Sequence, residues 1–241
     1  MKKTLFVAAL LLTGLTSTLN AQESKSATKP AVDSKTTNAA KGEKPEESPG
    51  WIILEEDWYF PLRFDSLVSM NNARMLYRKR EEKAAASELR RAITWLKFAE
   101  SHAEPITKSK VATAVSELTT LADDLEQGKL RDAALMENSL SRASAALAEW
   151  HYFKARESWG QSDEKYAAQY LQAAVAHLKH AAGSAHFQFG PDTVTVFDQV
   201  TQDDETTSEV ETFDHNLLGK HLDAIERAVK EMSDHLMKVG K

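Results

Sequence analysis

Apolar residues recur every three or four positions over most of the chain beyond residue 65, and polar residues fill the positions between them. This spacing places the apolar side chains on one face of a helix, and turn residues such as Pro105 and Gly128 interrupt it. The pattern predicts helices over about 66–80, 82–103, 105–127, 130–159, 162–182 and 217–239. We therefore expect an all-α domain over 51–241, a bundle of about six helices.

Two segments of this domain depart from the helical pattern. Residues 51–64, WIILEEDWYFPLRF, are rich in aromatic residues and broken by Pro61, which predicts an extended N-terminal strap across the helices. Residues 187–216 hold eight acids and no Lys or Arg, which predicts an acidic insertion with room for a short edge strand or hairpin at Val194 and Val196. Its Asp203-Asp204-Glu205 run lacks the spacing of a calcium loop, so we favour a solvated loop there.

The sequence also contains an internal repeat. Residues 73–103 overlay residues 155–185 at an offset of 82 without a gap, and twelve of the 31 positions are identical. Ala-rich helices match by chance more often than most sequences, but the shared Leu spacing and the shared Glu-Lys pair favour a true duplication. The bundle is therefore predicted to be built from a duplicated helical hairpin, and the third and sixth helices also align, at a larger offset.

The N-terminus predicts export. A basic start, an apolar run from Leu5 to Leu15 and small residues up to Ala21 are typical of a secretory signal peptide, with cleavage near Ala21. The run is shorter than the roughly 18 apolar residues that a transmembrane helix needs. Residues 22–50 contain Val32 as their only large apolar residue, which predicts a disordered linker. We expect a periplasmic or secreted protein without a transmembrane segment.

Composition and motifs narrow the chemistry further. The chain has no Cys, which excludes disulfides, thiolate catalysis and zinc-thiolate sites. A formal net charge of −6 argues against nucleic-acid binding, which relies on clustered Lys and Arg. The chain has no phosphate-binding loop, no Gly-x-Ser-x-Gly elbow and no repeated Glu-x-x-His pair. We expect no cofactor, no catalytic residues and no enzyme activity.

Two histidines stand out on the helix predicted over 162–182. On a helical wheel His177 and His180 fall away from the stripe through Leu171 and Leu178, which predicts a solvated outer face. The repeat aligns the same two histidines with Trp95 and Phe98, which favours a face that is partly covered or left open for a partner.

The histidines are also the candidate metal ligands. A pair three residues apart needs further ligands to hold a metal ion. His151 is the obvious recruit, but its height along an antiparallel hairpin differs from that of His177 by about 9 Å, so we expect the two to stay apart. His186, beyond Gly183, can fold back towards the pair. The candidate metal site is therefore His177, His180 and His186.

The two copies of the repeat, ARMLYRKREEKAAASELRRAITWLKFA and ARESWGQSDEKYAAQYLQAAVAHLKHA, resemble exported helical proteins of the YfdX-like periplasmic family. The resemblance covers about half of the domain and leaves the strap and the acidic insertion without a counterpart. It implies an all-α exported protein with a link to stress, and it supplies no catalytic residues.

Two functions are consistent with these features. The first is a non-catalytic exported interaction or scaffold protein that binds a protein partner or associates with itself. The alternative is a periplasmic carrier that binds a metal ion or a small ligand through surface histidines. A hydrolytic enzyme is the least favoured reading.

Overall fold

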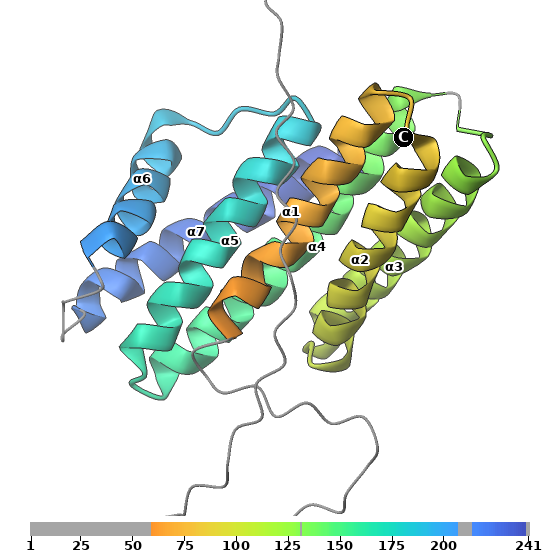
Figure 1. The fold of residues 1–241 in the computed structure, drawn as a ribbon. Coiled ribbons are helices and arrows are strands. Elements are labelled where there is room, and N and C mark those ends of the chain that lie inside the picture. Colours follow the sequence, from red (N-terminus) through yellow and green to blue (C-terminus); the bar gives the residue numbers. More distant parts are fainter. Residues whose placement is uncertain (1–58, 131, 207–213, 240–241) are drawn as a thin grey trace, which may run out of the picture. The chain divides into compact units, whose positions relative to one another are not determined.

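A computed structural model describes residues 59–130, 132–206 and 214–239, all within the unit Ile52–Lys241, and every regular element in these ranges is a helix (Figure 1). The helices are α1 Tyr59–Arg78, α2 Glu82–Ser101, α3 Pro105–Glu126, α4 Ala133–Gly160, α5 Glu164–Ser184, α6 Pro191–Thr206 and α7 His215–Val239. The all-α prediction is confirmed, with seven helices in place of about six. The predicted signal peptide and linker, 1–50, lie outside the described residues.

The duplicated hairpin is present as α1–α2 and α4–α5, and the two connecting turns have the same backbone geometry. Arg80 and Ser162, which are 82 residues apart, both have positive φ, of 66° and 57°. The amide that follows each of them donates to the carbonyl five positions earlier, at 3.0 Å after Arg80 and 2.9 Å after Ser162. This is the Schellman arrangement that closes helix ends, so the sequence repeat is also a structural repeat.

The same repeat positions are buried in both hairpins. The pairs Ala73/Ala155, Ala85/Ala167, Leu89/Leu171, Ala92/Ala174, Leu96/Leu178 and Ala99/Ala181 are all buried. Alanines let the paired helices approach closely, and the leucines fill the space between them. The prediction of a bundle built on a duplicated hairpin is therefore confirmed.

Helix α4 runs through the middle of the unit and joins its two halves. It has 28 residues, about 42 Å of helix, and it contacts α1, α2, α3, α5 and α7. Its first part, as far as Trp150, belongs to one apolar core with α1, α2 and α3. Its later residues, from Ala148 onward, belong to a second core with α5, α6 and α7.

The predicted strap is wrong where it can be checked. Tyr59–Phe64 form the first turns of α1 and are not extended, while 51–58 lie outside the described residues. Pro61 sits two residues into the helix, where its missing N–H would have no partner within the helix anyway. The proline that suggested a break is therefore compatible with the start of a helix.

The strand or hairpin expected in the acidic insertion is also wrong. Residues 191–206 form α6, which begins with a proline and carries Asp192 in its first turn. Phe197 and Val200 are buried against the second core, whereas Val194 is 42% exposed, so a three-residue spacing replaces the supposed alternation. The side chains of Asp203-Asp204-Glu205 lie outside the described part.

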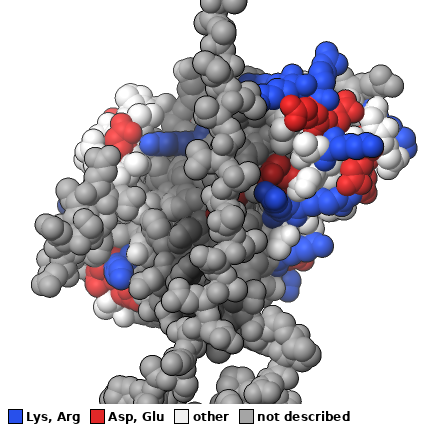
Figure 2. Space-filling model, viewed as in Figure 1, with Lys and Arg blue, Asp and Glu red and all other residues white. Residues whose placement is uncertain are grey.

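The surface carries mixed charge on the side formed by α2 and α3. Figure 2 shows basic and acidic side chains interspersed there, and Arg90 of α2 reaches both Asp123 and Glu126 of α3 at 2.9 Å. None of the described helices combines the length and the hydropathy that crossing a bilayer requires.

Candidate functional site

The two predicted site histidines of α5 are buried, so the expected solvated face is wrong. His177 is 0% exposed and His180 is 9% exposed. The reason is that α5 packs against α1, α4, α6 and α7, which leaves it little outer face. The sequence held a signal of this, because between Lys165 and Lys179 the helix carries no charged residue, and a helix without a charged face is typical of a buried one.

His151 of α4 stacks on His177, contrary to the expectation that they stay apart. Their ring centroids lie 5.2 Å apart and the rings are inclined by 21°. In a helix each Cα–Cβ bond tilts towards the N-terminus. His151 therefore leans away from the α4–α5 turn and His177 leans towards it, which closes the height difference that Cα positions alone suggest. We call His151, His177 and His180 the histidine layer.

The histidine layer lies between α1, α4 and α5, and short polar side chains contact it. Ser66 Oγ of α1 lies 3.4 Å from His177 Nε2. Ser144 Oγ of α4 lies 2.6 Å from His180 Nδ1 and also faces the sulfur of Met70 at 3.7 Å. Three ring nitrogens have no hydrogen-bond partner, namely His151 Nδ1, His177 Nδ1 and His180 Nε2.

Two arginines of α1 stand beside the layer. The Arg63 guanidinium lies 4.2 Å from the centroid of the Tyr170 ring and donates to Gln169 Oε1 at 2.7 Å. Arg74 donates to Asn71 Oδ1 at 2.6 Å and also reaches Ser184 and Glu137. From α1 the imidazoles thus meet the Ser66 hydroxyl, two cations and the backbone of Arg63, whose hydrogen bond to His177 favours the protonated ring.

This environment disfavours the protonated imidazoles. Burial, with a further contribution from His180, lowers the pKa of His177 from 6.5 to about 3. Burial and the charge of Arg74 lower the pKa of His180 to about 4. Burial, His177 and Arg63 hold the pKa of His151 well below 6.5. All three rings are therefore neutral at neutral pH.

The predicted metal ligands are not assembled into one site. His186 is exposed and forms the left-handed end of α5, with φ of 53°, beyond the helix end predicted at residue 182. Among the described residues no group of three or more His, Asp or Glu is placed to share a metal ion. The structure instead joins His177 and His180 to His151, which the sequence argument had set aside.

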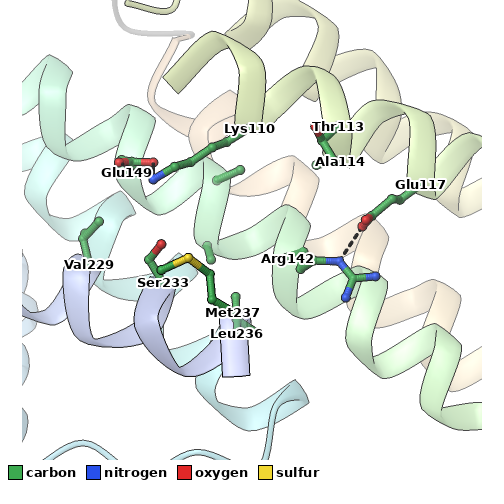
Figure 3. A pocket seen from close by; sticks show the side chains of 12 residues that line it. Lys110, Thr113, Ala114, Glu117, Arg142, Glu149, Val229, Ser233, Leu236 and Met237 are labelled. Carbon is green, nitrogen blue, oxygen red and sulfur yellow. Dashed lines mark hydrogen bonds and ion pairs between the residues drawn. The ribbon is translucent and has the colours of Figure 1, made fainter. Parts of the chain in front are cut away.

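A second candidate site is a groove between α3 and α7, with α4 as its floor (Figure 3). The cavity measures about 540 Å³, within the range of ligand-binding clefts. Its lining comes from all three helices: Lys110, Thr113, Ala114, Glu117, Arg142, Ala145, Ala146, Glu149, Val229, Ser233, Leu236 and Met237. No sequence pattern indicates this groove, because the groove depends on how the two halves are placed along α4.

The two sides of the groove differ in character. On the α3–α4 side, Lys110 pairs with Glu149 at 2.8 Å and Arg142 pairs with Glu117 at 2.6 Å. On the α7 side, Figure 3 shows Val229, Leu236 and Met237 facing the groove. Met237 is 61% exposed, so this wall presents apolar surface to solvent. We call this site the α3–α7 groove.

Comparison with known proteins adds no assignment to these sites. No family model matches the chain, and neither a curated protein nor a solved structure matches it. The resemblance to YfdX-like proteins therefore stays a prediction that rests on the repeat pattern.

Proposed function

We propose that this chain is a non-catalytic exported interaction protein that receives an amphipathic helix of a partner protein in the α3–α7 groove. The observation that carries the proposal is the open groove itself, whose opposite walls come from the two halves of the domain. Two helices on either side of a third helix offer a site for a further helix.

The floor and the α7 wall favour a helical occupant. Ala145 and Ala146 of the floor are small, as is Ala114 on α3, so a helix backbone can approach them closely. Leu236 and Met237 supply apolar contact along α7, and the flexible methionine can adapt to side chains of different shapes. The partner helix would bury its apolar stripe against this wall.

The α3–α4 wall favours an amphipathic occupant over a wholly apolar one. Lys110–Glu149 and Glu117–Arg142 place both signs of charge along the wall, about two helical turns apart on α3. A helix with polar residues beside its apolar stripe can lie against these ion pairs without burying an unpaired charge. A small apolar ligand would leave that wall without matching groups.

Other functions fit the geometry less well. The carrier alternative requires histidines at the surface, whereas His177 and His180 are buried. The Ser144–His180 pair is also enclosed, and the far nitrogen of His180 has no carboxylate partner to orient the ring for proton transfer. These observations support a binding role over a catalytic or carrier role.

The test uses the mature domain and an 18-residue synthetic amphipathic helix of Leu, Ala, Glu and Lys, with a scrambled peptide of the same composition. Binding is followed by fluorescence anisotropy and by the methyl NMR signals of Ala114, Ala146, Val229 and Met237. We expect saturable binding of the amphipathic peptide with shifts confined to these methyl groups.

The matched variants are Met237→Glu in the groove and Met75→Glu on α1. Met75 is 54% exposed, close to the 61% of Met237, and both lie in the last turn or so of their helices. We expect Met237→Glu to weaken binding at least tenfold and Met75→Glu to leave it unchanged. The proposal would be contradicted if both variants lost affinity for the amphipathic peptide to the same extent, or if the scrambled peptide bound as tightly as the amphipathic one. Binding of detergent monomers in place of the peptide would contradict it too.

A further inference from the structure

The histidine layer lies at the seam where α1 meets the α4–α5 hairpin. Figure 1 shows α1, in orange, in front of α4 and next to α5, and α1 contacts both of them. Ser66 and Met70 of α1 approach the layer directly, through His177 and through Ser144 beside His180. The layer is therefore part of the packing surface that holds α1 in place.

We propose that the histidine layer is an acid-sensitive latch, which holds α1 on the α4–α5 hairpin while the imidazoles are neutral and releases it when they take up protons. This inference concerns the seam and does not depend on the proposed partner site. It rests on the burial of three stacked or adjacent rings, on their unpaired nitrogens and on the charges that face them.

A backbone hydrogen bond of Arg63 raises the pKa of His177, but burial outweighs it, and the charged side chains around the layer offer no compensation for a proton. From α1 the layer faces Arg63 and Arg74, both cations. From α5 it faces the Tyr170 ring, and α4 contributes Ser144 and His151 itself. The nearest acid that contacts one of these groups, Glu137, already binds both Arg74 and Arg78. Within the described residues no hydrogen bond or ion pair joins a carboxylate to any of the three imidazoles.

Protonation would therefore place imidazolium ions near guanidinium groups, His151 near Arg63 and His180 near Arg74, in a site shielded from water. Like charges at short range repel, and a buried charge without a partner is costly. The low pKa values of His177, about 3, and His180, about 4, reflect this cost of charging the buried rings. The most direct relief is separation of α1 from α4 and α5, which admits water to the rings.

A difference in residue type between the two copies of the repeat explains why the latch exists only in the second hairpin. The positions of the first hairpin that align with His177 and His180 are Trp95 and Phe98, which do not titrate. They are partly exposed and face α4 residues such as Trp150, by an edge contact of 6.4 Å from Phe98. Acid should therefore act on the seam of α1 with α4–α5 and spare the packing of α2 on α3.

The test is hydrogen exchange of the whole chain, measured by mass spectrometry at pH 7 and pH 4.5 and corrected for the intrinsic exchange rate at each pH. At pH 4.5 we expect peptides from α1 and from the facing parts of α4 and α5 to lose protection about tenfold more than peptides from α3. In a His177→Phe/His180→Gln double variant, in which only His151 of the layer still titrates, this selective loss should be much reduced. Phe keeps the ring stack and Gln keeps a partner for Ser144.

Two further variants keep the test decisive. If the double variant does not fold at pH 7, His180→Gln alone should reduce the selective loss. His186→Asn, at an exposed position whose left-handed backbone Asn tolerates, should behave like the natural chain. Loss of protection spread evenly over all helices, no loss at pH 4.5, or an unchanged loss in the histidine variants would overturn the latch.

Discussion

The imidazole of His151 stacks on that of His177 with ring centroids 5.2 Å apart, at a place where two helices of one hairpin and a third helix from the other hairpin meet. Both rings are almost fully buried, at 2% and 0% exposed. Burial disfavours a charge on either ring, and two charged rings at this distance repel each other. The stability of the domain is therefore tied to pH through residues in its interior.

The first prediction concerns stability against acid. The folded-state pKa values of His180 and His177, about 4 and about 3, lie below the ordinary 6.5, so the unfolded chain binds more protons between these limits. The contribution of each neutral ring to the free energy of unfolding is present in full above pH 6.5. It is lost as the pH falls from 6.5 towards the folded-state pKa of that ring. At about 1.4 kcal/mol per pKa unit, the free energy of unfolding should drop by several kcal/mol between pH 7 and pH 4.

Urea unfolding at a series of pH values measures this drop. Because Asp and Glu also titrate near pH 4, the informative quantity is the difference between variants. His180→Gln should reduce the number of protons taken up on unfolding at pH 5 by about one. A pH dependence identical in His180→Gln and the natural chain would contradict the buried, neutral state of this ring.

The second prediction concerns the duplicated seam. Leu89 and Leu171 are equivalent in the repeat and both are 0% exposed. Leu89→Ala and Leu171→Ala should each lower the free energy of unfolding by about 2–5 kcal/mol, because each leaves a cavity in a packed core. Leu135→Ala serves as the control, since Leu135 is 52% exposed and its truncation should change stability by less than about 0.5 kcal/mol. Equal effects of all three substitutions in urea unfolding would argue against the two equivalent seams.

The third prediction concerns the paired turns. Arg80 and Ser162 adopt the left-handed conformation at φ of 66° and 57°, which costs a residue with a Cβ about 1–2 kcal/mol relative to glycine. Arg80→Gly and Ser162→Gly should each raise the free energy of unfolding, by up to about 1 kcal/mol after the larger entropy of an unfolded glycine is subtracted.

The turn after α3 supplies the control in the opposite direction, because glycine already occupies its left-handed position. Gly128 has φ of 62° at the same position of its turn, so Gly128→Ala should lower the thermal midpoint where the other two substitutions raise it. A fall in stability for either Arg80→Gly or Ser162→Gly would mean that the side chain, and not the backbone turn, decides the conformation there.

The sequence predicted the fold because its signals were local and repeated. Apolar spacing located the helices, and the offset of 82 paired the two hairpins, as the turns at Arg80 and Ser162 confirm. The errors arose where one local signal allows two structures. Pro61 ends an extended segment as readily as it starts a helix, and Val194 and Val196 fit a strand only if Phe197 and Val200 are disregarded.

The site was less predictable because it depends on which helices surround α5. A helical wheel finds the face opposite one apolar stripe, but it cannot tell that a second and a third neighbour cover that face. His177 and His180 were therefore placed outside although they are inside. The alignment of these histidines with Trp95 and Phe98 was the better guide, since residues that replace large rings in a repeat tend to occupy the same kind of packed position.

The most direct measurement is an NMR titration of the imidazole side chains of the natural chain, with His177 and His180 assigned through the His177→Phe and His180→Gln variants. The account predicts that both rings stay neutral from pH 8 down to about pH 5, and that they begin to titrate only below it, towards midpoints of about 3 and about 4 unless acid opens the domain first. Titration of either ring near the ordinary 6.5 would contradict the account, because it would place that imidazole in water and remove the buried layer on which the seam depends.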